Sequence, residues 1–335
     1  MIGESSSVKG CFHYRRTGRR PLLIGVLGVA LATQVLPGQS ADAPPAIPAL
    51  TNALAFRPSA DGGFEFDTGL LRGRLRAGGK SLGLTEVTQA ATGLRVDRSN
   101  GLLSHYRVFT RGKRHGGGAW DWPSTARSLP NGGVAVRWPA AEGRPFGLVA
   151  VYLWRRPDIL DLTTSVEANE DVAGFESFLA SYFSEGFTNS LVHVQGDADH
   201  AGQPYFRAAL KSDGDWQMFT RDEAARVLAQ DGRWKLEPNP VDWVLRPVLA
   251  RPLGLRRAPA TGLAFAVMAF PEDCFAIATP QENEGHRSLY LSLFGRDLAK
   301  GQTLRARTRL VMLSSEAEHR AVPALERFLS RRGSE

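Results

Sequence analysis

Residues 286–294 read His-Arg-Ser-Leu-Tyr-Leu-Ser-Leu-Phe, and this stretch decides the fold class. Its three leucines alternate with Ser288, Tyr290 and Ser292. Apolar and polar residues that alternate with period two indicate a half-buried β-strand, because successive side chains point to opposite faces of a sheet. The stretch therefore predicts a strand with one face in a core.

A second alternating run follows, after a loop that we expect between Gly295 and Gly301. Two alternating runs joined by a short glycine-bounded loop predict an antiparallel pair of strands. The apolar face of the second run consists of Leu304, Ala306, Thr308, Leu310 and Met312, and the opposite face carries Arg305, Arg307 and Arg309.

Short apolar runs punctuated by glycine fill the chain from Leu54 to Gly101, which is typical of an antiparallel meander. Helical patterns occur only at 222–229 and 315–331, the second with an apolar stripe of Val322, Leu325, Phe328 and Leu329. The chain therefore predicts a mainly β protein, a large antiparallel β-sandwich with a short C-terminal helix. Further strands are expected at 107–111, 133–138, 146–154, 159–168, 190–194, 263–269 and 275–278.

The first 43 residues have the pattern of an export signal. Four arginines between positions 15 and 20 precede an apolar run from Pro21 to Leu36, and Ala41-Asp42-Ala43 offers a small-x-small cleavage site. The apolar run is shorter than the roughly 20 residues that span a bilayer, so we expect no permanent membrane anchor. A twin-arginine signal and an ordinary secretory signal both remain open. The prediction is an exported protein, periplasmic or secreted.

An alanine- and proline-rich linker is expected at 44–53, followed by one domain over 54–335. The net charge is +7, and residues 1–43 carry five basic and two acidic groups, so the remainder is +4. A mild charge without a basic cluster argues against nucleic acid as a partner and favours neutral or acidic small ligands. Cys274 is the only cysteine after the signal, so no intramolecular disulfide is possible, and a free cysteine is usually buried. The oligomeric state stays open.

Two sequence patterns, one of a serine hydrolase and one of a metal site, are weak evidence for those functions. Residues 79–83 (Gly-Lys-Ser-Leu-Gly) fit a nucleophile elbow and residues 115–118 (His-Gly-Gly-Gly) fit an oxyanion loop, but their order is reversed and no helix is expected after Ser81. His193, Asp197, Asp199 and His200 could gather metal ligands, yet Gly-Asp-Ala-Asp-His-Ala-Gly is more typical of a solvated hairpin loop. We expect neither a metal site nor a cofactor.

The tryptophans are more informative, because several stand beside charged residues. Trp120-Asp121-Trp122 lies in a glycine-rich segment, and Asp215-Trp216 and Asp242-Trp243 repeat the combination. A flat aromatic beside a few polar groups suits a small-ligand pocket, and a sugar offers an apolar C–H face with hydroxyl edges. The alternative is that these rings fill the core. The predicted substrate-binding set is Trp120, Asp121, Trp122, Glu176, Tyr182, His193 and Arg221.

Three features together resemble the galactose mutarotase-like superfamily: the strand-rich layout, the closing run from Leu298 to Leu310, and His286 entering a strand after acidic residues. The resemblance implies an antiparallel β-sandwich that binds carbohydrate on a concave face, as in aldose epimerases, some glycoside hydrolase domains and polysaccharide lyases. In the epimerases a glutamate and a histidine act as base and acid. Here Glu282 or Glu284 with His286 would take these catalytic roles.

Lyase chemistry would instead need a base such as Tyr182 or His193 and a cation such as Arg221. The predicted function is that of an exported carbohydrate-binding protein, either an enzyme using general acid–base chemistry or a non-catalytic glycan-binding or cell-envelope structural protein. The enzyme hypothesis requires His286 and a neighbouring carboxylate to converge with one of Glu176, Tyr182, His193 or Arg221 in one pocket.

Overall fold

The computed structural model describes residues 54–77, 81–314 and 317–333. The predicted export signal and linker lie outside this range, as do Gly79 and Lys80 of the elbow motif and Ser315 at the start of the predicted C-terminal helix. Within the described ranges, no helix combines the length and the apolar character needed to cross a membrane.

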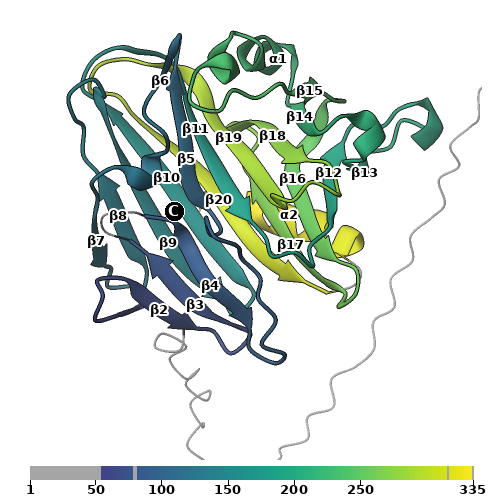
Figure 1. The fold of residues 1–335 in the computed structure, drawn as a ribbon, viewed down its shortest axis with the longest axis horizontal. Coiled ribbons are helices and arrows are strands. Elements are labelled where there is room, and N and C mark those ends of the chain that lie inside the picture. The colour runs from purple at the N-terminus through teal and green to yellow at the C-terminus, as the bar shows by residue number, and fades with distance from the viewer. Residues whose placement is uncertain (1–53, 78–80, 315–316, 334–335) are drawn as a thin grey trace, which may run out of the picture. The chain divides into compact units, whose positions relative to one another are not determined.

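Two large sheets and one small sheet make up the fold (Figure 1). All pairings are antiparallel except that of β14 with β15. In spatial order, the nine-stranded sheet contains β13 (Tyr205–Ala208), β12 (Asn189–Val194), β16 (Leu249–Ala258), β17 (Leu263–Ala269), β20 (Thr303–Leu313), β10 (Ile159–Ala168), β9 (Phe146–Arg156), β8 (Val134–Trp138) and β7 (Thr125–Ser128).

The seven-stranded sheet contains β15 (Val244–Leu245), β14 (Trp216–Thr220), β18 (Cys274–Pro280), β19 (Ser288–Leu298), β11 (Val172–Tyr182), β5 (Ser104–Thr110) and β6 (Lys113–Arg114). The small sheet contains β1 (Arg57–Pro58), β2 (Phe64–Asp67), β3 (Leu71–Arg76) and β4 (Gly83–Gln89). The helices are α1 (Glu223–Ala229) and α2 (Ala317–Leu329). The predicted fold class, a large antiparallel β architecture with a short C-terminal helix, is confirmed.

The main core lies between the two large sheets. Leu289, Leu291 and Leu293 of β19 are fully buried in it. The layers are also joined by a polar contact, because His105 Nε2 on β5 lies 2.9 Å from Thr164 Oγ1 on β10. Burial lowers the pKa of His105 to about 4, so this histidine is neutral in the folded protein near neutral pH.

The predicted half-buried character of the 286–294 strand is wrong. Ser288, Tyr290 and Ser292 are as buried as the leucines that alternate with them. β19 lies inside its sheet between β18 and β11, and Tyr290 belongs to a second aromatic cluster that covers the outer face of that sheet. Both faces of the strand therefore contact protein.

The predicted antiparallel pairing of the strand at 286–294 with the alternating run from Leu304 to Met312 is also wrong. β19 bonds to β11 and β18, whereas β20 bonds to β10 and β17 in the other large sheet. The chain crosses from one layer to the other at Ala299–Gln302, and β19 continues through Gly295 to Leu298. A short loop reverses the chain, but it does not decide whether the returning strand lies beside its predecessor or across the core from it.

The strands predicted at 159–168 and 263–269 coincide with β10 and β17. β11 and β16 are not among the predicted strands. Both strands are buried on their two faces, so they show no clean alternation.

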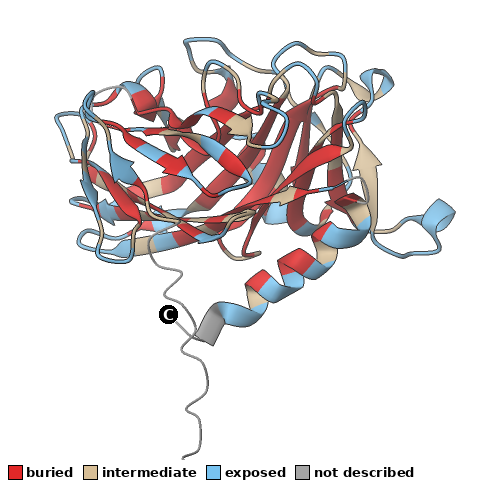
Figure 2. Cartoon of the chain, turned by 90° about the horizontal axis from the view of Figure 1, so that it is seen from below, coloured by how far each residue is buried: buried red, intermediate tan, exposed pale blue. Residues whose placement is uncertain are grey.

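α2 packs on the outer face of the nine-stranded sheet. Leu325 and Phe328 are buried against that sheet, with Val322 and Leu329 packed beside them, which confirms the predicted apolar stripe. Figure 2 shows buried and exposed positions on different sides of this helix.

Candidate functional site

A cavity of about 580 Å3 opens on the outer face of the seven-stranded sheet, the side that faces away from the main core. Side chains of β5, β11, β14 and β19 line it together with the loop that precedes β15. The lining residues are Tyr106, Arg107, Phe178, Tyr182, Trp216, Trp234, Asn239, Pro240, Val241, Asp242, Trp243, His286 and Tyr290.

A β-bulge in β5 brings Tyr106 and Arg107 to the same cavity. The register between β5 and β11 shifts at this point, so that Phe178 alone lies opposite both residues. Strict alternation would direct neighbouring residues to opposite faces, and an extra residue in one strand re-aims a side chain. Arg107 thus lines the cavity instead of the main core.

Aromatic rings of the sheet form a large part of the lining. Phe178 and Tyr290 are stacked with their centroids 4.6 Å apart, and Tyr182 meets Tyr290 edge-on at 5.8 Å. Burial raises the pKa of Tyr290 to about 12, and burial beside Tyr290 also raises the pKa of Tyr182. Both are therefore neutral hydroxyls at physiological pH, suited to hydrogen bonding with a polar ligand.

A second part of the lining is held by a buried ion-pair network. Arg233 Nη1 lies 2.8 Å from Glu176 Oε2, and Arg233 Nη2 lies 2.8 Å from Asp231 Oδ2. Glu176 and Arg233 are completely buried. This network fixes the next residue, Trp234, whose ring meets Trp243 edge-on at 5.3 Å. The positions of Trp234 and Trp243 are thus stabilised by contacts within the protein.

At the cavity, His286 lies beside Trp216 with the ring centroids 5.2 Å apart. Its Nδ1 is 2.7 Å from Glu284 Oε1, and its side chain is 54% exposed. Glu284 also accepts a hydrogen bond from the backbone N–H of His286. This pair is an imidazole oriented by a carboxylate and open to solvent, an arrangement that can exchange protons with a bound molecule.

The predicted site residues fall into three groups. Tyr182 and His286 line the cavity, and Glu284 contacts it through His286. Glu176 is buried in the ion pair with Arg233, where it supports the site without lining it. Glu282 does not line the cavity either, and its backbone carbonyl accepts a hydrogen bond from Arg287.

The remaining predicted residues are not brought to this cavity. His193 lies on β12 of the other large sheet, against Phe206. Arg221 binds Asp222 at 2.7 Å and the carbonyl of Pro271. Their contacts with neighbouring protein groups are of the kind that stabilises the fold.

Residues 120–122 do not line the cavity, and both tryptophans belong to hydrophobic clusters. Trp120 is 8% exposed, stacks on Tyr106 at 4.3 Å and donates a hydrogen bond to Asp121. Trp122 is equally buried and lies 3.8 Å beneath the guanidinium of Arg144. Trp120 therefore supports a lining residue, and the tryptophans that line the cavity are the later ones.

The predicted site set omitted Tyr106, Arg107, Trp216, Trp234, Trp243 and Tyr290. The combinations Asp215-Trp216 and Asp242-Trp243 indicated two of these residues, because an aromatic residue beside a charge is typical of a partly exposed site. Arg107 carried no such signal, because the bulge that turns it outward cannot be recognised from alternation alone.

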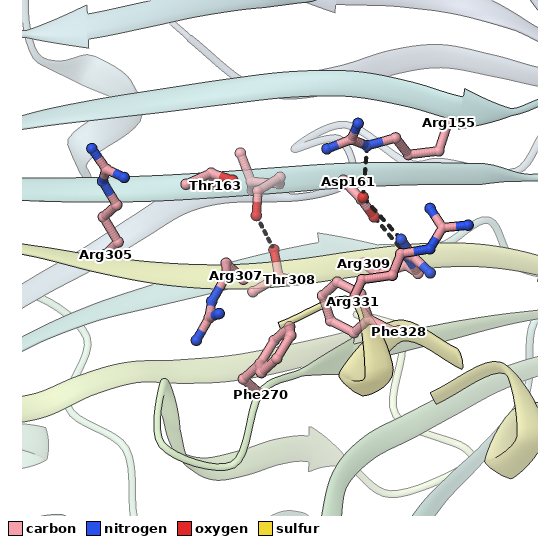
Figure 3. A pocket seen from close by; sticks show the side chains of 11 residues that line it. Arg155, Asp161, Thr163, Phe270, Arg305, Arg307, Thr308, Arg309, Phe328 and Arg331 are labelled. Atoms are coloured by element: carbon pink, nitrogen blue, oxygen red, sulfur yellow. Dashed lines mark hydrogen bonds and ion pairs between the residues drawn. The ribbon is translucent and has the colours of Figure 1, made fainter. Parts of the chain in front are cut away.

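A second, smaller cavity of about 200 Å3 lies on the outer face of the nine-stranded sheet beside α2 (Figure 3). It contains several arginines, but carboxylates pair with them. Asp161 lies 2.6 Å from Arg309 and 3.0 Å from Arg155, and Asp273 lies 3.0 Å from Arg307. These contacts join β10, β20 and β9, so we regard the cluster as part of the scaffold.

Within the described ranges, no three histidine, cysteine, aspartate or glutamate side chains are placed to share a metal ion. Asp197 and His200, from the loop considered above, form a hydrogen-bonded pair on an exposed turn.

No protein-family model matches the sequence, and no curated protein sequence matches it significantly. Solved structures that the chain matches include the Slr1438 protein of Synechocystis sp. PCC 6803, at 14% identity and a TM-score of 0.49, covering 79% of this chain and 98% of that one. They also include a putative aldose 1-epimerase of Escherichia coli K12, at 11% identity and a TM-score of 0.44, covering 75% and 99%.

A heparan sulfate lyase HepC mutant of Pedobacter heparinus matches at 8% identity and a TM-score of 0.44, covering 78% of this chain and 36% of that one. All three TM-scores are below 0.5, so the galactose mutarotase-like superfamily stays a prediction. The function of this chain has to be argued from its own side chains.

Proposed function

We propose that the cavity on the seven-stranded sheet binds a carbohydrate. The observation that carries the proposal is the composition of the lining: partly exposed Trp216 and Trp243 stand beside tyrosine hydroxyls and an arginine in an open space of about 580 Å3. That volume lies within the range of small-molecule sites, which are largely apolar with a few convergent polar groups. Indole rings suit the C–H faces of a sugar, and the phenols and guanidinium suit its oxygen atoms.

A Trp243→Ala variant tests this proposal on an array of neutral and acidic glycans. We expect the full-length wild type to bind at least one glycan and the variant to bind it about tenfold more weakly or worse, because a central tryptophan often dominates a binding site. Tyr205→Ala, which removes an aromatic ring of β13 outside the cavity, is the control and should bind like wild type. Equal binding by the wild type and Trp243→Ala would contradict the proposal.

A second candidate function is acid–base catalysis on the bound sugar, favoured by the 2.7 Å contact between His286 Nδ1 and Glu284 Oε1 at the cavity. Glu284 would orient the imidazole, and His286 would move a proton to or from the ligand. Either an epimerisation or a lyase-type elimination would use such a group. The non-catalytic alternative is a glycan-binding or envelope structural protein with the same cavity.

The two alternatives differ in turnover. Incubation with a glycan panel, followed by assays for anomeric exchange, new reducing ends and unsaturated products, should detect a reaction that falls by about 10²- to 10⁴-fold in His286→Ala. His200→Ala is a matched control, because His200 also bonds a carboxylate through Nδ1, at 2.6 Å, but lies outside the cavity. Turnover that survives in His286→Ala would remove this residue from the chemistry, and binding without any turnover would favour the non-catalytic alternative.

The proposed place of action is outside the cytoplasm. The support is the basic, apolar and small-residue pattern of positions 15–43. Fractionation of cells that produce the full chain tests it, with a shortened extracytoplasmic product as the expected result.

A further inference from the structure

Arg107 is a buried cation without a carboxylate partner. Its residue is 5% exposed, and no ion pair of this side chain is present within the described ranges. Nε and Nη1 have no hydrogen-bond partner, and Nη2 is 3.5 Å from the Tyr106 hydroxyl, at the limit of a hydrogen bond. Leaving a buried charge unpaired is costly, so a position of this kind calls for a counter-group.

The other buried arginines that the structure describes have more partners, and Arg144 lacks one only at Nε. Arg233 has two carboxylate partners, and Arg256 donates to the carbonyl of Ser288 and the hydroxyl of Thr279. Among the arginines that the structure describes, Arg107 is the only one with two buried guanidinium nitrogens that lack an acceptor. Its guanidinium instead lies near the rings of Tyr106 and Trp234, at 5.1 and 5.4 Å from their centroids.

The residues that carry these unsatisfied donors line one cavity. The indole N–H groups of Trp234 and Trp243 are also buried without an acceptor, and both residues line the same space as Arg107. The cavity carries one carboxylate among its lining residues, Asp242, which is paired with Lys235. Three lining residues therefore carry four nitrogen atoms without an acceptor, and the one lining carboxylate is already paired with a cation.

We infer that the carbohydrate carries a negatively charged substituent, a carboxylate or a sulfate, that binds Arg107 while the sugar ring contacts Trp216 and Trp243. This inference rests on the proposed function, and it adds the substrate class. A guanidinium binds a carboxylate or a sulfate with paired N–H donors, and a charge-assisted bond in a partly dry site is stronger than a bond to a neutral hydroxyl. The indole N–H groups add donors for further oxygen atoms of the same ligand.

Matched pairs of probes test the inference by titration calorimetry on the full chain. Tetragalacturonate is compared with its methyl ester, and a heparin-derived tetrasaccharide with its desulfated, carboxyl-reduced counterpart. We expect wild type to bind at least one charged probe about tenfold or more tightly than its neutral partner, with an affinity that decreases as salt rises. A preference within the first pair reports a carboxylate, and a preference within the second pair but not within the first reports sulfate.

Arg107→Met keeps much of the side-chain volume and should abolish the preference for the charged probe, while Arg107→Lys should keep part of it. Arg305→Met changes the net charge equally at an exposed position outside the cavity and should keep the whole preference. Melting temperatures of all variants show whether each one is folded.

Equal affinity for charged and neutral probes, or a preference that survives in Arg107→Met, would overturn the inference. A neutral glycan that binds wild type but not Trp243→Ala would then leave the proposed function standing. If none of the four probes binds, the inference is rejected for carboxylated and sulfated glycans alike. If the wild type also binds no glycan on the array, both proposals fail.

Discussion

His105 is a buried residue whose protonation makes the stability of the fold depend on pH. It is completely buried between the sheets, where desolvation lowers its pKa to about 4 from an ordinary value near 6.5. The unfolded chain therefore binds more protons than the folded one between these two values. Stability is fully present above pH 6.5 and decreases as the pH falls towards 4, by about 3 kcal/mol for this group.

Urea unfolding of wild type and His105→Asn at pH 7 and pH 4.5 measures this contribution. The variant removes the titrating group and retains an amide that can bond Thr164, so we expect its stability to change less between the two pH values. His115, whose pKa is also lowered to about 4 by burial and by Lys113, keeps part of the dependence in both proteins. Identical pH dependence in the two proteins would contradict the assignment.

Residue-level features were predictable where they depend on nearby sequence. His286 and Glu284 are two positions apart, and their contact follows from that proximity. Arg107 was not predictable, because its direction depends on a bulge whose partner strand lies some seventy residues further along the chain. The Asp-Trp combinations marked the correct kind of residue, but the sequence could not distinguish Trp243 in the cavity from Trp120 behind it.

At the scale of elements, Gly295 keeps β19 continuous. It sits at an irregularity between β19 and β11 with a φ of 64°, and an added Cβ would collide with the ring of Phe275. Gly295→Ala should therefore lose about 2 kcal/mol or more, combining a left-handed backbone penalty with steric overlap. Gly301→Ala has a similar φ of 77° but open space, so it should lose only about 1 kcal/mol. Chemical denaturation compares them, and equal losses would show that the overlap has no cost.

Elements were predictable where alternation was clean, as in β10, or where an apolar run was bounded by turns, as in β17. β11 and β16 were missed because residues on both faces are buried, which removes the period-two signal. The pairing of β19 with β20 was predicted wrongly because local sequence specifies a reversal of the chain and not the sheet that receives it. That choice depends on which apolar faces meet across the core.

At the scale of the whole described domain, the two outer faces of the sheet pair differ. The nine-stranded sheet carries α2 and a set of arginines paired with carboxylates, whereas the seven-stranded sheet carries the open aromatic cavity and the unpaired Arg107. Binding is accordingly expected on one face, with the other face acting as scaffold. A mainly β fold could be inferred from the sequence, but this asymmetry could not, because it arises from side chains that are distant in the chain.

Hydrogen–deuterium exchange of the full chain, with and without a glycan identified on the array, tests the central claim most directly. The account predicts slower exchange on binding in residues 234–243 and in the segment around His286, with no change in α2 or β12. Protection confined to the nine-stranded sheet and α2, with the 234–243 loop unaffected, would contradict it.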